Sequence, residues 1–327
     1  MDRQIESKCL ELVENFHTLK KGNRMEYTEM LLACAELYMA AGREPDLDRL
    51  KGCKKLLKSR AGLFSNFRGM DELLVRCKMA LSADPERYFD DLEQEYRRLK
   101  TFFSGEQTVL AAMILAEQSG AETLTEKTKR IYKEMQSAHP WLTSENDLPF
   151  AALMAVSGTD ADAVYAQAEE IYTILKKNLR ADRDTLQMLS HVLAIRDGRA
   201  EAKCEKVCAL AKGLMAARRS LGWGSRLAIL GLLADSGLPT DALVERICET
   251  DAFLKKYKPF RGLFGVGGQC RRMFAVQMVH ASLSREEGLG ASAMMTASVE
   301  LAIITMILMM IILTSTASSS SSASSGH

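Results

Sequence analysis

The segment from Arg261 to Arg272 places glycines and arginines directly before a predicted helix. Main-chain N–H groups of a glycine-rich loop and the positive end of a helix can together bind an anion, and arginine side chains add charge-assisted hydrogen bonds. The segment lacks the Gly-Lys-Ser/Thr ending of a P-loop and the third glycine of a dinucleotide-binding turn, so a plain hairpin loop is the alternative. The candidate anion-binding residues are Gly265, Gly267, Gly268, Arg261, Arg271 and Arg272.

Two histidines and one cysteine pair are the other candidates for chemistry. His191 directly follows Ser190, and adjacent residues on a helix point about 100° apart, so the two do not form a catalytic pair. His280 lies in an equally apolar stretch. Cys204 and Cys208 share a helix face, but no second Cys/His pair follows at a zinc-binding spacing. We therefore expect no catalytic residue, no metal site and no cofactor. We interpret the two cysteines as packing residues and each histidine as a hydrogen-bonded core group or a residue at the lip of a groove.

Two polar segments have simpler interpretations. Ser144 to Asp147 precede an apolar helix with Pro149 in its first turn, which is the composition that a capped helix start favours. The basic run from Lys51 to Arg60 is interleaved with leucines and follows acidic residues. We interpret the first segment as a helix cap and the second as a solvated helix face.

Composition and charge narrow the class of protein. The chain has 327 residues, of which 47% are hydrophobic and 26% charged, typical of a folded chain with either two domains or one elongated array. Its 43 basic and 42 acidic residues leave a net charge of +1, so we expect no nucleic-acid partner. Eight scattered cysteines and a polar first segment without a signal-peptide core predict a cytoplasmic protein with reduced thiols.

Short apolar helices alternate with longer amphipathic ones along the chain. The short helices begin near residues 30, 71, 107, 147, 184, 226 and 269, at a spacing of 36 to 43 residues. Segments such as Leu227–Ala234 are apolar on all sides and must be covered on every side, which neighbouring hairpins achieve and one hairpin does not. The pattern predicts an all-α fold of stacked helical hairpins, an α-solenoid-like or curved α/α array of about six to seven units.

The composition changes after residue 290. Leu301–Leu313 has 13 residues, one of them polar and none charged; extended to residues 297–317 it has 21 residues, enough to span a bilayer. The 13-residue apolar core instead suits a terminal helix that packs on the array. We predict one helical-repeat domain over 1–290, an apolar C-terminal helix over 291–314 and a disordered Ser-rich tail over 315–327. A single C-terminal membrane anchor is the alternative to a wholly cytoplasmic chain.

Motifs spread over nearly the whole chain carry a family resemblance. They are Phe64-Ser-Asn-Phe-Arg-Gly, Leu142-Thr-Ser-Glu-Asn-Asp-Leu-Pro-Phe-Ala-Ala-Leu, Leu186-Gln-Met-Leu-Ser-His-Val-Leu-Ala, Leu227-Ala-Ile-Leu-Gly-Leu-Leu-Ala, Asp251-Ala-Phe-Leu-Lys, and Gly262-Leu-Phe-Gly-Val-Gly with Arg272-Met-Phe-Ala. With these motifs the chain resembles the bacterial family of uncharacterised proteins catalogued as domain of unknown function 4003. The resemblance implies no activity, cofactor or catalytic residue. The segment Met306–Leu313 departs from the Ala- and Gln-rich composition of the relatives.

Three hypotheses follow from the sequence. The first is a non-catalytic binding or scaffold protein that holds a protein or peptide partner on the concave face of the array. The second is the same body attached to a membrane through residues 297–317. The third is an enzyme or anion binder that uses the Gly-rich loop over 262–272.

Overall fold

The computed structural model describes residues 1–62, 65–69, 71–101, 105–262 and 265–286. Within these ranges every regular element is helical. The longer helices are α1 (Arg3–Gly22), α3 (Leu47–Arg60), α5 (Pro85–Lys100), α7 (Ala121–Ala138), α9 (Ala161–Asn178), α11 (Ala200–Ala216) and α12 (Thr240–Leu254). Between them come α2 (Thr28–Ala40), α4 (Glu72–Leu81), α6 (Glu106–Leu115), α8 (Leu148–Val156), α10 (Arg183–Ala194), the 3-10 helix η3 (Ser225–Leu233) and α13 (Gly268–Glu286). Three single-turn 3-10 helices, η1 (Asn66–Arg68), η2 (Glu145–Asp147) and η4 (Lys258–Phe260), lie in the connections.

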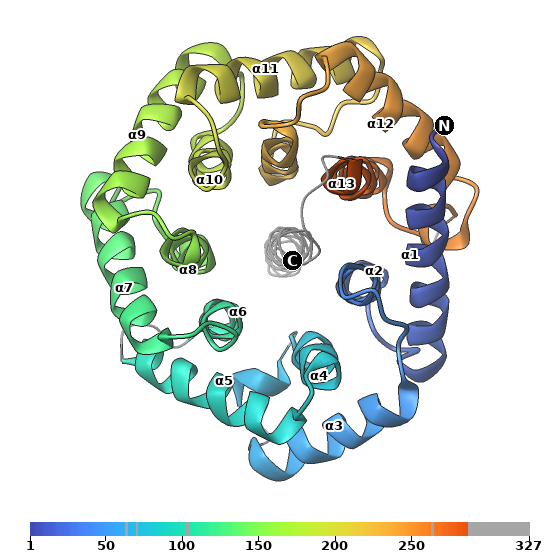
Figure 1. Ribbon diagram of the computed structural model, residues 1–327, viewed down its shortest axis with the longest axis vertical. Coiled ribbons are helices and arrows are strands. Elements are labelled where there is room, and N and C mark those ends of the chain that lie inside the picture. The colour runs from blue at the N-terminus through green and yellow to red at the C-terminus, as the bar shows by residue number, and fades with distance from the viewer. Residues whose placement is uncertain (63–64, 70, 102–104, 263–264, 287–327) are drawn as a thin grey trace, which may run out of the picture.

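The hairpins form a closed ring (Figure 1). Helices α1, α3, α5, α7, α9, α11 and α12 form an outer layer, and α2, α4, α6, α8, α10, η3 and α13 form an inner layer. Each outer helix contacts the next outer helix around the ring, and α1 also contacts α12 and α13. A solenoid has two free ends, whereas here the first and last hairpins contact each other. The curved α/α array expected from the sequence is therefore present, and it closes on itself.

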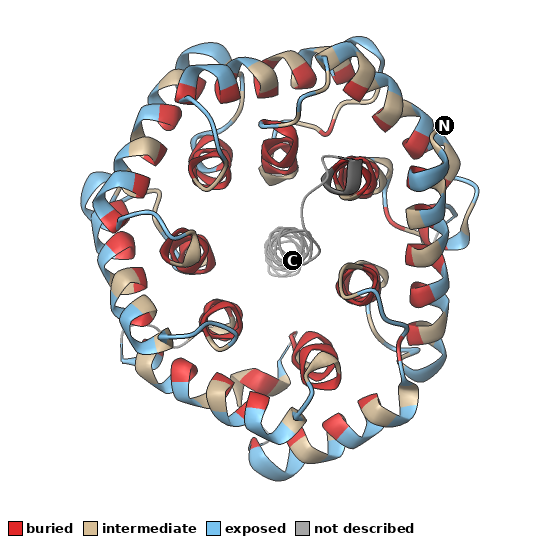
Figure 2. Cartoon of the chain, viewed as in Figure 1, coloured by how far each residue is buried: buried red, intermediate tan, exposed pale blue. Residues whose placement is uncertain are grey.

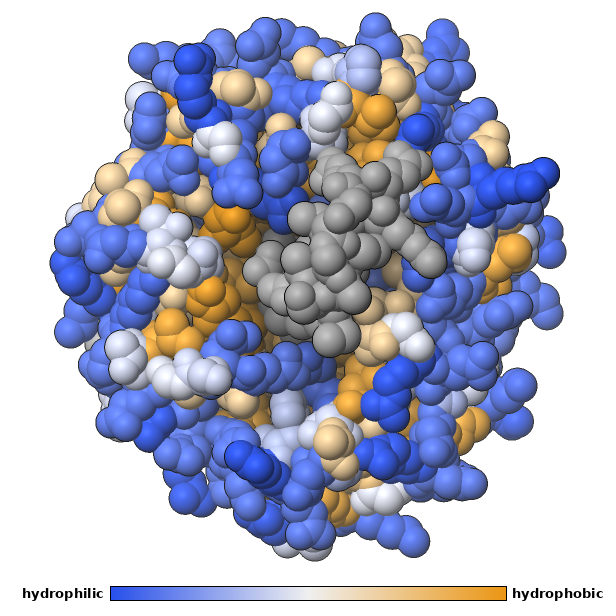
Figure 3. Space-filling view, viewed as in Figure 1, coloured by the Kyte–Doolittle hydropathy of each residue, from blue (hydrophilic) through white to orange (hydrophobic). Residues whose placement is uncertain are grey.

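Burial separates the two layers (Figure 2). Inner helices are buried along almost their whole length; in α8 all eight residues from Leu148 to Ala155 are buried. Outer helices bury one stripe, as α5 does with Tyr88, Phe89, Leu92 and Leu99, and expose the opposite face. Because each buried Leu or Phe contributes roughly 1.5–3 kcal/mol, an inner helix is stable only when its neighbours cover it. The hydropathy surface agrees, because hydrophilic residues cover most of the outer rim and hydrophobic residues are visible inside it, toward the centre of the ring (Figure 3).

The connections that lead from an outer helix to the next inner helix share one face of the ring, which we call the long-loop face. Neighbouring contacts show this: Asn23 accepts a hydrogen bond from Arg76 at 2.7 Å, and Gly105 lies against the Glu145 side chain of the following connection. The inner helices thus start on the same face, and their dipoles present positive ends there. Carboxylates in their first turns complement this charge, namely Glu29, Glu72, Glu106 and Asp184.

Short turns occupy the opposite face, and cations from outer helices bind the carbonyl ends of the inner helices there. Arg49 of α3 donates to carbonyl groups at the end of α4 at 2.6 and 2.7 Å. Lys127 of α7 donates to Ala155 at the end of α8 at 2.9 Å, and Lys206 of α11 donates to the turn after η3. A cation at a helix C-terminus satisfies carbonyls that lack an intrahelical partner and interacts favourably with the dipole. These bonds attach α4, α8 and η3 to the outer layer.

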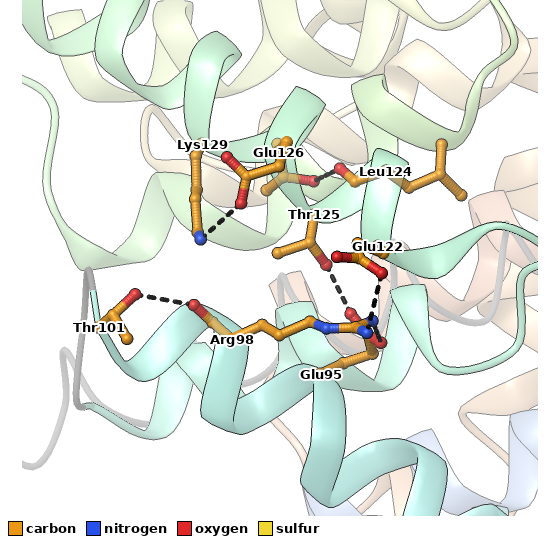
Figure 4. Close-up of polar contacts among 9 residues, drawn as sticks. Glu95, Arg98, Thr101, Glu122, Leu124, Thr125, Glu126 and Lys129 are labelled. Carbon is orange, nitrogen blue, oxygen red and sulfur yellow. Dashed lines mark hydrogen bonds and ion pairs between the residues drawn. The ribbon is translucent and has the colours of Figure 1, made fainter.

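Buried polar contacts also join successive outer helices. The Glu95 carboxylate of α5, 3% exposed, accepts hydrogen bonds from Arg98 at 2.6 Å and from Thr125 of α7 at 2.5 Å. Arg98 extends further to Glu122 at the start of α7, 3.3 Å away (Figure 4). A buried carboxylate is stable only with such partners, so this network fixes the register between α5 and α7.

The sequence-predicted helix starts agree with the structure to within two residues. One element differs in kind: Ser225–Leu233 forms a 3-10 helix instead of an α-helix. Within it, an added Cβ on Gly231 would lie 2.7 Å from Val192 of α10, so this close contact accepts only glycine. The predicted segments over 291–314 and 315–327 lie outside the described residues. Among the helices that are described, none has the length and apolarity to span a membrane.

Candidate functional site

A cavity of about 420 Å³ opens at the long-loop face between the connections that precede α10 and η3. Its floor is apolar and buried, formed by Leu214, Leu221, Leu227 and Leu230. Trp223 lines the cavity while remaining 54% exposed, and the Met215 side chain, also in the lining, is 50% exposed. Large apolar side chains held at the mouth of a concave apolar site are typical of ligand or partner binding.

Cations surround this Trp223 cavity. The Arg180 guanidinium lies 5.8 Å from the centre of the Trp223 ring, within the range of a cation–π contact. Lys212 of α11 lines the opposite part of the same cavity. Both side chains are exposed, and neither forms an ion pair with a carboxylate of the described residues. The cavity therefore combines an apolar interior with a positively charged mouth.

A second, shallower groove continues from the cavity along the outside of the ring. Asn178 and Lys212 line both depressions, so the two are contiguous. The groove lies between α9 and α11, and its lining includes Cys204 and Cys208. These two cysteines are buried and unbonded, and burial raises the pKa of the Cys204 thiol to about 12. The pair thus contributes apolar lining, in agreement with its interpretation from the sequence.

The predicted anion-binding residues lie next to this cavity but are only partly brought together. Asp251 of α12 is 2% exposed and pairs with Arg271 at 2.8 Å and with Arg219 at 3.1 Å. Arg271 also donates to the Phe260 carbonyl at 3.3 Å, so it attaches the loop to α12. Arg272 lies beside Gly268, at 3.4 Å from an added Cβ there.

The remaining predicted residues of this loop do not converge on that cluster. The Arg261 side chain is exposed, and Gly267 has open space around it. An added Cβ on Gly265 would lie 2.5 Å from the Arg261 carbonyl oxygen, so this glycine serves a tight turn. Leu263 and Phe264 lie outside the described residues. Because Arg219, Arg271 and Arg272 surround a single carboxylate, the cluster retains a positive excess, and the anion-binding hypothesis stays a prediction for Arg271, Arg272 and Gly268.

The Arg272→Ala variant tests this prediction. Burial lowers the pKa of the Arg272 guanidinium, and the charges of Arg271 and Arg219 act in the same direction. A bound phosphate would relieve this repulsion, so we expect millimolar phosphate or a nucleotide to raise the melting temperature of the wild-type protein and to leave that of Arg272→Ala unchanged. Arg199→Ala, on an exposed arginine at the start of α11, is the control. A wild-type protein that responds to no anion would contradict the hypothesis.

The buried histidines and the polar helix start have the positions that the sequence predicts. His191 and His280 are 2% and 5% exposed, and burial lowers the pKa of each imidazole to about 3. Ser144 and Asp147 form a capping box at the start of η2 and α8. In the described part of the chain, no three His, Cys, Asp or Glu side chains are grouped closely enough to hold a metal ion.

Sequence reasoning missed Trp223. Its only local signal is an aromatic residue between two glycines, Gly222-Trp223-Gly224, in a connection between helices. The backbone conformation explains why residue 222 is a glycine, because Gly222 has a φ of 90° and packs against Gln269 at the start of α13. The cavity itself is formed by residues from two connections and from helices α9, α11 and η3, which spacing along the chain does not reveal.

The fold and site define a class of protein, a closed ring of α/α hairpins with an apolar, positively rimmed cavity on one face. The chain belongs to the family described as protein of unknown function (DUF4003), whose model matches residues 15–311. This confirms the family resemblance inferred from the motifs.

The chain is similar to the uncharacterized protein YeaA of Bacillus subtilis (strain 168), with 25% identity over 185 residues. That match covers 53% of this chain and 54% of the relative, so the chain spans about half the length of this curated relative. No solved structure matches the chain.

Proposed function

We propose that this protein is a non-catalytic binding protein whose Trp223 cavity accepts an apolar side chain of an acidic protein or peptide partner. The observation that carries the proposal is the position of Trp223, half exposed above a floor of buried leucines. Tryptophan is the residue type most often found to dominate binding energy at protein interfaces, especially beside a desolvated pocket. This proposed site lies on the long-loop face, and binding on the concave face of the array, which the sequence suggested, stays a prediction.

The charges at the cavity mouth support an acidic partner. Arg180 and Lys212 carry no carboxylate partner among the described residues. The arginine cluster around Asp251 adds further positive charge close to the cavity, because Arg219 of that cluster directly precedes the lining residues Ser220 to Trp223. Carboxylates that flank an apolar anchor would pair with these cations and select the partner. The adjoining groove between α9 and α11 gives room for several more residues of an extended peptide. Because Glu201 and Glu205 line this groove, the residues that enter it would be uncharged or basic, and the acidic residues would lie at the mouth of the Trp223 cavity.

Tryptophan fluorescence provides the test, because the chain has only Trp141 and Trp223. In a Trp141→Phe background, peptides with one Leu or Phe flanked by Asp and Glu are expected to change the Trp223 emission, and the same anchors flanked by Lys are not. Measured by the anisotropy of a fluorescently labelled peptide in otherwise wild-type protein, Trp223→Ala should weaken binding by roughly 30-fold or more, the effect of an interface hot spot. Trp141→Ala, on a tryptophan that is 97% exposed, is the matched control. Binding that survives Trp223→Ala would contradict the proposal.

The two other hypotheses concern other parts of the chain. The enzyme or anion-binding alternative depends on the Arg272 experiment described above. The membrane-anchor alternative concerns residues 297–317, which lie outside the described part of the chain, and it stays a prediction from the sequence.

A further inference from the structure

A second cavity, of about 370 Å³, opens on the long-loop face around Trp141. Unlike the Trp223 cavity, it is lined mainly by polar groups from the starts of three successive inner helices. Asp147 lies at its buried base, while Asp182 and Asp184 lie at its exposed rim. Hydroxyl and amide side chains complete the polar lining: Ser144, Asn146, Thr185, Gln187 and Ser225. Trp141, 97% exposed, adds an aromatic face at the mouth.

The three carboxyl groups of this cavity have no cationic partner. Among the described residues, neither Asp182 nor Asp184 forms an ion pair, and Asp147 has only His191 nearby. Asp182 serves as a helix cap, accepting from the backbone N–H of Thr185 at 2.8 Å, but a cap does not neutralise its charge. A carboxylate that is withdrawn from water is stable only with a cation or hydrogen-bond donors beside it.

A buried group beneath the cavity is also left without a partner. His191 of α10 is 2% exposed, and its Nδ1 atom forms no hydrogen bond. That atom faces one carboxylate oxygen of Asp147 at 3.8 Å, while the other oxygen accepts the backbone N–H of Ser144 at 2.9 Å. An unpartnered buried nitrogen costs about 1–3 kcal/mol. The Asp147 carboxylate at the base of the cavity therefore has no charged donor beneath it, and an ammonium group can approach it only from the cavity side.

We propose that the Trp141 cavity binds a small organic amine. An ammonium group supplies a positive charge and N–H donors to the carboxylate that it contacts, and the second ammonium of a diamine can reach another carboxyl group of the cavity. An alkyl chain attached to it can pack on Trp141, whose face also attracts a cation. A metal ion fits less well, because within the described residues no three acidic or histidine side chains are close enough to hold one. A sugar would leave the negative charge uncompensated.

The charges around Asp147 make the binding depend on pH. Burial raises the pKa of Asp147 to about 7, and the charge of Asp184 adds to this shift. The other titratable groups that face it are Asp182 and His191 from α10, Tyr132 from α7 and Glu145 from η2. None of them is a cation, since burial keeps His191 neutral. An ammonium ligand requires ionised Asp147, so its affinity is expected to rise about tenfold between pH 6 and pH 8.

The test uses the full chain carrying Trp223→Phe, which leaves Trp141 as the only tryptophan. Titration with 1,4-diaminobutane should change the Trp141 emission and raise the melting temperature, whereas the uncharged 1,4-butanediol should do neither. Asp184→Asn removes a rim charge without removing a helix cap and should weaken diamine binding about tenfold. Asp241→Asn, an exposed acid in the first turn of α12, is the matched control and should have no effect.

The experiment distinguishes amine binding at the Trp141 cavity from its absence. Three results would overturn the proposal. They are equal binding of the diamine and the diol, equal diamine binding by Asp184→Asn and Asp241→Asn, and no response of the protein to the diamine at pH 8. Circular dichroism of Asp184→Asn confirms that a loss of binding is not a loss of folding. The proposal is independent of peptide binding at the Trp223 cavity, because the Trp223→Phe background removes that reporter and each cavity is tested by its own tryptophan.

Discussion

The Leu12→Ala variant is expected to increase hydrogen exchange at the far end of the chain, in α12 and α13, as well as in α1 itself. Leu12 is fully buried, and truncation of a buried leucine to alanine costs about 2–5 kcal/mol. Helix α1 contacts α2 and α3 on one side and α12 and α13 on the other. Loosening α1 therefore uncovers both the first and the last hairpins.

Hydrogen exchange on the two sides of the ring distinguishes a closed ring from an open solenoid. In an open solenoid each repeat contacts only its sequence neighbours, so α12 and α13 would respond no more than the middle of the chain. In the closed ring, protection of α12 and α13 should fall further than protection of α7 and α8, which lie on the opposite side (Figure 1). Leu10→Ala is the matched control, because Leu10 is on the same helix and 37% exposed. A uniform loss of protection would contradict ring closure as the source of the coupling.

Acid is expected to destabilise the protein partly through His280. Burial, followed by the charge of Arg196, lowers the pKa of His280 to about 3, against about 6.5 in the unfolded chain. Between these values the unfolded state binds the extra proton, so stability falls as the pH falls from about 6.5 to 3. At pH 5 the loss from this one side chain is about 2 kcal/mol. Urea unfolding of His280→Gln should therefore show a decrease between pH 7 and pH 5 that is smaller than wild type by about that amount.

His191 has the same low pKa but should contribute little net pH dependence, because Asp147 compensates for it. The pKa of Asp147 is raised to about 7, so between about pH 4 and 6.5 the folded state holds a proton on Asp147 while the unfolded state holds one on the histidine. Folding then moves a proton between the two residues without net uptake. Asp147→Asn removes the compensation and should add about 2 kcal/mol of destabilisation between pH 7 and pH 5.

The reciprocal variant has the opposite sign. In His191→Gln only the Asp147 contribution remains, and stability should rise as the pH falls toward 5, relative to wild type. His17→Gln, on an exposed histidine, should change the pH dependence less than His280→Gln does. Equal pH dependence in wild type, Asp147→Asn and His191→Gln would show that this pair does not exchange a proton on folding.

The fold could be predicted from the sequence because its signals are local. Apolar runs such as Leu148–Ala155 must be buried on every side, and amphipathic helices of the α5 type bury one stripe, so alternation of the two defines a double layer of helices. Glycines and capping residues then mark the ends of the helices. Closure of the array could not be predicted, because it depends on the small rotation between successive hairpins, which accumulates over the whole chain.

In the candidate sites, too, some features follow from the sequence and others only from the tertiary structure. The sequence by itself determined that Ser144 to Asp147 cap a helix and that His191, His280, Cys204 and Cys208 lie on apolar helix faces, since a side chain on an apolar face is buried whatever the curvature of the array. Only the tertiary structure decided that Asp147 has His191 beneath it and Asp184 beside it, and that Trp223 covers a floor of leucines. These neighbours come from different hairpins, and they meet because the parallel inner helices all begin on one face of a closed ring.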